Sequence, residues 1–271
     1  MSFMISHQTA EFGRDVHAAA GAWGPSTSRA NFCEEDYGIT FYIAEFINSL
    51  TNLAYIYYGL RHMYPSRGPR RSLLRPDIDF MSSSMVILGV GSFLFHASLR
   101  HTLEFVDELS MLVLTWSMLR ATYTAGQPPA TARAMSVALA LFYVPYSALY
   151  VLTGDIILQV VAFVGAIALI GFRTHYLFGA LRSTSASVNE RRAWRGRTLS
   201  AVAVALLGYA LWNIDLQFCP ELRAIRRELG LPFAWLFEFH GWWHIFTAMG
   251  AGLYMDVVRE MRAVIEQEKK R

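Results

Sequence analysis

Residues 79–99 read DFMSSSMVILGVGSFLFHASL, a stretch that is almost free of charge and long enough to cross a bilayer. A transmembrane helix needs about 20 predominantly apolar residues. Including this stretch, the windows that meet the condition are 39–61, 79–99, 105–125, 134–153, 155–178, 198–217 and 234–257. The chain is 54% hydrophobic and 17% charged, which is more apolar than an ordinary soluble domain. We therefore expect an all-α membrane protein, a bundle of seven transmembrane helices.

The basic residues predict the orientation of this bundle. With seven spans, the loops 62–78, 120–133 and 179–197 lie on the same side as the C-terminal tail. Including the span edges, that side holds 18 of the 24 Lys and Arg residues. Because basic loops tend to face the cytosol, we expect a lumenal N-terminus and a cytosolic C-terminus. The basic clusters are explained as topology signals, and we expect no nucleic-acid partner.

The chain divides into three parts. We expect residues 1–38 to be a polar lumenal segment, residues 39–258 the bundle, and residues 259–271 a charged cytosolic tail. The first segment lacks the apolar core of a cleavable signal peptide, so the first span is expected to direct membrane insertion. Cys33 and Cys219 both fall on the lumenal side, which permits a disulfide bond between them. Two unpaired thiols near the membrane surface are the alternative.

Three histidines lie at membrane depth, where a polar side chain is costly unless it lines a working cavity. His96 is near the lumenal end of the second span, and His240 and His244 are four residues apart at the lumenal start of the seventh. Neutral imidazole is a common zinc ligand, and this spacing lets two rings converge on one ion. We predict a zinc site with these three ligands. Hydrogen bonding between helices is the alternative role for each histidine.

A serine and an aspartate are expected at the same depth. Ser92 precedes His96 by four residues and shares its helix face, and Asp107 lies at the lumenal start of the third span. Catalytic zinc commonly leaves one position for water, whose pKa it lowers to roughly 7. We expect Asp107 to accept the proton of that water and Ser92 to stabilise the oxyanion. Ser92 considered alone would be a small packing residue.

An acidic cluster precedes the first span. It comprises Asn31, Glu34, Glu35 and Asp36, followed by Glu45, which we expect about two turns inside the apolar helix. Oxygen ligands at this density suit Ca²⁺, although the spacing is not that of an EF-hand. A solvated acidic tail is the alternative.

Two more carboxylates lie within apolar stretches. We expect Asp215 and Glu238 to hydrogen-bond with amide side chains of neighbouring helices, with Asn48, Asn52 or Asn213 as partners.

Several motifs cover nearly the whole chain. They are WGP at 23–25, NFCEEDY at 31–37, YIAEFIN at 42–48, GSFLFH at 91–96, DEL at 107–109, WNIDLQFC at 212–219 and FHGWWHI at 239–245. Together they resemble the alkaline ceramidases, which are seven-span hydrolases related to the adiponectin and progestin receptors.

The resemblance implies zinc-dependent cleavage of the ceramide amide within the membrane, giving a sphingoid base and a free fatty acid, with regulation by calcium. It implies that Ser92 and Asp107 are catalytic and that Cys33 pairs with Cys219. The zinc ligands it implies are His96, His240 and His244. The calcium ligands it implies are Asn31, the Phe32 carbonyl, Glu34, Asp36 and Glu45.

Two calcium positions depart from the family pattern. The family usually has Asp at the position of Asn31 and Asn at the position of Asp36. Because the exchange preserves the formal charge, we expect calcium binding to survive. The resemblance also suggests a location in the endoplasmic reticulum or Golgi membrane. The expected partners are ceramide and the bilayer, with no obligatory protein partner.

Two other classes of protein are compatible with parts of this pattern. One is a seven-span lipid-binding receptor of the adiponectin and progestin type without significant turnover. The other is a b-type haem protein with axial histidines. The haem interpretation leaves Ser92 and Asp107 without a role, and turnover of lipid separates a receptor from an enzyme.

Overall fold

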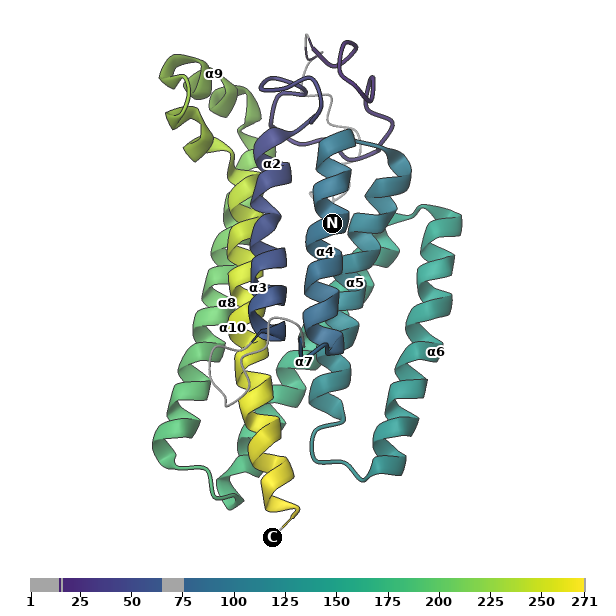
Figure 1. Ribbon diagram of the computed structural model, residues 1–271, viewed down its shortest axis with the longest axis vertical. Helices are drawn as coiled ribbons and strands as arrows, with labels where there is room; N and C mark the ends of the chain where they lie inside the picture. The colour runs from purple at the N-terminus through teal and green to yellow at the C-terminus, as the bar shows by residue number, and fades with distance from the viewer. Residues whose placement is uncertain (1–14, 16, 65–75, 271) are drawn as a thin grey trace.

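The computed structural model describes residue 15, residues 17–64 and residues 76–270 (Figure 1). Within these residues the regular structure is helical, apart from an isolated bridge between Thr40 and Ile43. The elements are α2 (Phe46–Thr51), α3 (Leu53–Met63), α4 (Phe80–Ser98), α5 (His101–Tyr123), α6 (Pro129–Thr153), α7 (Ile156–Ala180), η2 (Leu181–Ser183), α8 (Val188–Gln217), α9 (Cys219–Leu229), η3 (Phe233–Phe237) and α10 (Phe239–Glu268). The expectation of an all-α protein is confirmed for this part of the chain.

The membrane-facing surface is formed by long apolar helices. Four helices of the described chain, α4, α6, α7 and α8, are long and apolar enough to cross a bilayer. Leu141 on α6, Phe172 on α7 and Leu199 on α8 expose 71%, 75% and 70% of their surfaces, as expected of side chains that face lipid. The other three predicted windows coincide with α2 and α3, with α5, and with α10. The total of seven spans and the orientation of the termini remain predictions.

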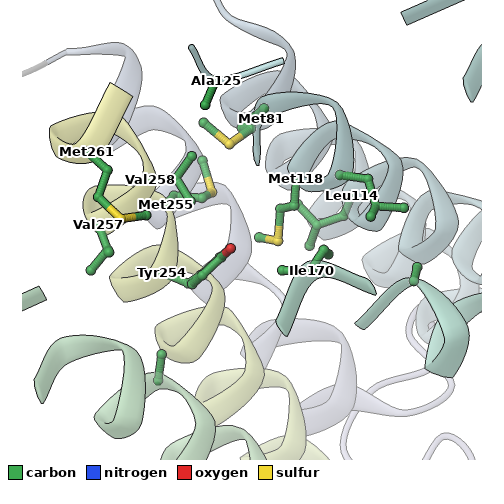
Figure 2. Packing of buried hydrophobic residues seen from close by; sticks show 14 of the residues in the cluster. Met81, Leu114, Met118, Ala125, Ile170, Tyr254, Met255, Val257, Val258 and Met261 are labelled. Carbon is green, nitrogen blue, oxygen red and sulfur yellow. The ribbon is translucent and has the colours of Figure 1, made fainter. Parts of the chain in front are cut away.

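The bundle is arranged around α10. This helix packs along α8 and also contacts α2 and α3, while α4 lies between α3 and α5. Figure 1 shows α6 at the edge of the bundle, where it contacts α5 and, more sparsely, α7. The main apolar core joins the second half of α10 to α4, α5 and α7 (Figure 2). The side chains shown there include Met81, Met118, Ile170, Met255 and Val258.

The first helix begins later than the sequence predicts, and the last helix ends later. Glu45 adopts an extended conformation (φ −106°, ψ 96°) and immediately precedes α2, so its expected place two turns inside a helix was wrong. The reason is a tertiary cap: the Glu34 carboxylate accepts the backbone N–H groups of Ile47 (2.7 Å) and Asn48 (2.8 Å). These are among the N–H groups that a helix start leaves unpaired. At the other end, α10 continues through the expected tail to Glu268.

The disulfide bond between Cys33 and Cys219 is present, with a Cα–Cα distance of 5.3 Å, which confirms that prediction. It joins the N-terminal segment to the start of α9. Two arginines of α9 strengthen this connection, because Arg223 Nε and Arg226 Nη2 donate to the Cys33 carbonyl at 2.8 and 2.7 Å. The N-terminal segment is thereby held against the end of the bundle where α10 begins.

Close packing of α3 on α4 depends on Gly89. A Cβ atom there would lie 2.7 Å from Ile56 Cγ1 and 3.0 Å from the Asn52 carbonyl oxygen. Gly171 on α7 provides a matched control, since a Cβ atom there has nothing within 4 Å. We expect Gly89→Ala to destabilise the protein by about 1–3 kcal/mol through overpacking. Gly171→Ala should leave stability unchanged or raise it, because Ala favours a helix.

Thermal unfolding of the detergent-purified variants measures this difference. A Gly89→Ala variant that unfolds at the same temperature as the native protein would contradict the close approach of α3 and α4.

Candidate metal centre and active site

Three buried histidines form the centre of the site. His96 on α4 and His240 and His244 on α10 place one potential ligand nitrogen each within 4.8 Å of the others. His96, His240 and His244 expose 0%, 5% and 4% of their surfaces, respectively. Among the described residues, this is the one group of three or more His, Cys, Asp or Glu side chains that lies so close together. Three convergent imidazoles suit a metal ion of the zinc type, so the donor set fits the expected metal.

Hydrogen bonds select which nitrogen of two of these rings is available. His96 Nδ1 lies 2.5 Å from Glu45 Oε2, and His244 Nδ1 lies 3.0 Å from Thr51 Oγ1. His96 Nε2 is buried and has no hydrogen-bond partner among the described residues. A histidine whose Nδ1–H is held by a carboxylate presents Nε2 as its ligand atom, the arrangement found at many metal centres. The partnership of Thr51 with His244 carried no signal in the sequence.

The position of His240 and His244 depends on how α10 begins. Asp215, at the end of α8, accepts the backbone N–H groups of Phe239 and His240. It also accepts the N–H group of Cys33 at 3.4 Å. The carboxylate therefore caps α10 and ties it to the N-terminal segment. This places the first two turns of α10, which carry the two histidines, against α8.

The expected amide partners of Asp215 and Glu238 were therefore wrong. Asp215 binds the start of α10, and Glu238 pairs with Arg226 at 2.8 Å. The physical reason is that a helix N-terminus and a buried guanidinium both combine N–H donors with positive charge. They therefore stabilise a buried carboxylate better than a neutral amide side chain does.

Ser92 and Asp107 meet at the same end of the bundle. The Ser92 hydroxyl hydrogen-bonds to the Asp107 carboxylate, which joins α4 to α5. Ser92 is 2% exposed and lies one helical turn before His96. The structure thus brings these two side chains together, with Ser92 one helical turn from His96 on α4, and their catalytic role stays a prediction.

The acidic cluster folds against the beginning of α2. Glu34, Asp36 and Glu45 are buried, and Asp36 Oδ1 has no hydrogen-bond partner in the described part of the chain. Burial, followed by the charge of Glu45, raises the pKa of Glu34 to about 8. Burial and the same charge raise the pKa of Asp36 to about 7. Glu35 is separate from this group, since its carboxylate pairs with Arg226 at 3.0 Å.

This arrangement fits a hard cation in its donor chemistry. The charge of Glu45 acts on both Glu34 and Asp36, and the Phe32 N–H group donates to Asn31 Oδ1 as well as to Glu45 Oε1. Carboxylate and amide oxygens are ligands that suit Ca²⁺. Some of these oxygens already accept protein hydrogen bonds, such as Glu45 Oε1 from the Phe32 N–H at 3.3 Å.

Glu45 and Phe32 connect the acidic cluster to the histidines. Glu45 contacts His96 directly, and the Phe32 ring centroid lies 3.8 Å from that of His240 and 5.1 Å from that of His96. A change in the acidic cluster therefore reaches the histidine cluster through one hydrogen bond and the two ring contacts of Phe32.

Comparison with known proteins finds similarity along most of the chain. A family profile described as "Ceramidase" matches residues 24–271. The chain is 29% identical over 257 residues to an alkaline ceramidase of Saccharomyces cerevisiae, covering 90% of this chain and 79% of the relative. It is 27% identical over 237 residues to alkaline ceramidase 3 of Mus musculus, covering 87% of this chain and 84% of the relative. An alkaline ceramidase of Arabidopsis thaliana is 27% identical to the chain over 234 residues, covering 84% of this chain and 82% of the relative.

Metal content tests the histidine cluster. We expect His240→Ala to remove the metal from the purified protein, because two remaining imidazoles do not hold the ion. Glu45→Gln should weaken metal affinity about 10- to 100-fold, since the carboxylate orients His96. His62→Ala is the matched control, because His62 is equally buried but pairs with Asp256 at 2.9 Å.

Elemental analysis of the three variants beside the native protein gives the result. Equal metal loss in His62→Ala and His240→Ala would show that the effect comes from general destabilisation.

Proposed function

The chain belongs to the ceramidase family, and from that premise we propose that it is a zinc-dependent amidohydrolase of ceramide. The reaction would cleave the N-acyl amide and release a sphingoid base and a free fatty acid. The observation that carries this proposal is the convergence of His96, His240 and His244 beside the hydrogen-bonded pair of Ser92 and Asp107. A lipid-binding receptor would leave that pair without a role.

The three histidines would hold the zinc ion through their available nitrogens. When bound, zinc supplies Lewis acidity, which polarises the amide carbonyl and lowers the pKa of a water molecule. Glu45 keeps the His96 ring in the required orientation through Nδ1. Thr51 does the same for His244.

Asp107 is suited to move the proton. In the proposed reaction its carboxylate accepts a proton from the attacking water, and a new bond forms between the water oxygen and the carbonyl carbon. The same proton then passes to the amide nitrogen as the bond between carbon and nitrogen breaks. The products are the free amine of the sphingoid base and the fatty acid.

Ser92 would respond to the protonation of Asp107. In the resting arrangement its hydroxyl group is engaged with the Asp107 carboxylate. Once that carboxylate is protonated it is a weaker acceptor, so the Ser92 hydroxyl can donate instead to the oxyanion that develops on the substrate. The Ser92 hydroxyl thus becomes available as a hydrogen-bond donor when negative charge develops on the substrate oxygen.

The membrane provides access to this substrate. The apolar exposed surfaces of α6, α7 and α8 place the protein in a bilayer, where ceramide resides. We propose a seven-span topology with the histidine cluster toward the lumenal side and the basic loops in the cytosol. The endoplasmic reticulum or Golgi membrane is the proposed location.

Calcium is the proposed regulator. Asn31, the Phe32 carbonyl, Glu34, Asp36 and Glu45 would hold the ion, which would offset the negative charge buried there. The ion would order the N-terminal segment and thereby support the contacts of Glu45 and Phe32 with the histidines.

Hydrolysis of ceramide by the purified protein tests the reaction. We expect the native protein to release sphingoid base and His240→Ala to release none. Asp107→Asn should retain its metal but react about 10²- to 10⁴-fold more slowly, because it lacks the proton acceptor. Ser92→Ala should lose about 10²- to 10³-fold, as expected when one oxyanion donor is removed. Asp155→Asn changes an exposed helix cap by the same substitution and should react as the native protein does.

The decisive negative result is a zinc-loaded, calcium-supplied native sample that releases no product from several ceramides. That outcome would favour the receptor interpretation.

Calcium dependence is tested separately at Asp36. We expect Asp36→Ala to lose calcium binding and calcium stimulation while keeping its zinc, because Asp36 does not contact the histidines. Glu45→Gly should lose the stimulation and most of the activity together, since Glu45 serves both clusters. Glu35→Gln removes the neighbouring charge that pairs with Arg226 and should keep calcium binding.

Calorimetric titration with calcium and the ceramide assay provide the two measurements. Unchanged calcium stimulation in Asp36→Ala would remove this residue from the proposed site.

A further inference from the structure

A basic pocket lies at the end of the bundle opposite the histidine cluster. It is a hollow of about 260 Å³ where α5 ends, α6 begins and α10 ends. Its charged and hydroxyl side chains include Arg120, Thr124, Arg133, Ser136, Arg262 and Lys269. One carboxylate, that of Glu266, also lines it. Four cations against one anion make the pocket strongly positive.

Hydrogen bonds to the protein hold three of these cations in place. Arg262 Nη1 donates to the Ala121 carbonyl (2.8 Å), and Lys269 Nζ donates to the Gln127 carbonyl (2.8 Å). Arg120 Nε donates to Ser136 Oγ at 3.1 Å. Because each group has further N–H donors, these bonds orient the cations without using their full capacity. Glu266 forms an ion pair with Arg262 at 3.6 Å and offsets one of the four positive charges.

Three helix ends meet at this pocket: the start of α6 and the ends of α5 and α10. Ala132 and Arg133 of the pocket belong to the first turns of α6, which is 25 residues long and has no acidic residue in its first turn. No side chain caps this helix start. The positive end of the α6 dipole is opposed there by the negative ends of α5 and α10, so the positive charge of the pocket comes from its four basic side chains.

The depth of the pocket indicates the kind of anion. The apolar exposed surface of α6 begins at Val137, which follows Ser136 of the pocket directly, and continues through Leu141 and Val144. A bilayer that covers this surface brings its headgroup layer to the level of Arg133 and Ser136. Arg, Lys and hydroxyl donors at this level are suited to the phosphate of a lipid headgroup.

We propose that the basic pocket binds the headgroup phosphate of an anionic membrane phospholipid. Arg133 on α6 and Lys269 at the C-terminal cap of α10, both exposed, contact the phosphate, and Arg120 and Arg262 stand behind them. The bound lipid links the start of α6, the helix at the edge of the bundle, to the end of α10. This site is separate from the histidine cluster and does not depend on the proposed reaction.

Native mass spectrometry of the detergent-purified full chain tests the proposal, with phosphatidic acid and phosphatidylcholine as probes. The test variant is Arg133→Gln with Lys269→Gln. The matched control is Arg182→Gln with Arg192→Gln, which removes the same charge from exposed positions near η2 and the start of α8. We expect the native and control proteins to retain phosphatidic acid over phosphatidylcholine. The test variant should bind phosphatidic acid roughly tenfold or more weakly.

Three outcomes would overturn the proposal. The first is equal retention of the two lipids by the native protein. The second is an equal loss of phosphatidic acid in both double variants, which would indicate a diffuse charge effect. The third is displacement of the lipid by inorganic phosphate at the same concentration, which would identify a site for a free anion. Ceramide turnover by each variant is recorded in parallel, so that a failure of the proposed reaction is distinguishable from a failure of the lipid site.

Discussion

The contact between the Glu45 carboxylate and His96 Nδ1 is the interaction on which the rest of the site depends. Both side chains are fully buried, and an isolated charge there would be very costly. The pair is tolerated because Glu45 also accepts hydrogen bonds from the Asn48 side chain and the Phe32 backbone. One carboxylate thus joins the N-terminal segment, α2 and α4, and sets the orientation of a proposed metal ligand.

The N-terminal segment consequently acts as part of the site. Its disulfide with the start of α9, the two arginines that bind the Cys33 carbonyl and the Asp215 carboxylate hold it over the end of the bundle. Asp215 also caps α10, so one side chain positions the segment and the two histidines of that helix. Through this shared support, the proposed binding of calcium at the segment would act on the proposed hydrolysis at the histidines.

The two ends of the bundle have different chemistry. The end with the histidines concentrates carboxylates that are held by helix starts and arginines. The opposite end carries the basic pocket and the core that joins α10 to α4, α5 and α7. Because the lipid-facing helices between them are apolar, polar chemistry is confined to these ends and to the bundle interior.

The sequence by itself determined the helical membrane class, and it indicated the disulfide and the candidate site residues. Apolar length identifies the candidate spanning segments. The predicted seven crossings put His96, His240, His244 and Asp107 at one depth, so this expectation follows from counting spans. Only the tertiary structure decided that Glu45 precedes α2 and that Asp215 caps α10. It also decided that Thr51 holds His244. Which donor a buried carboxylate or hydroxyl meets depends on segments far apart in the chain, and no periodicity encodes that encounter.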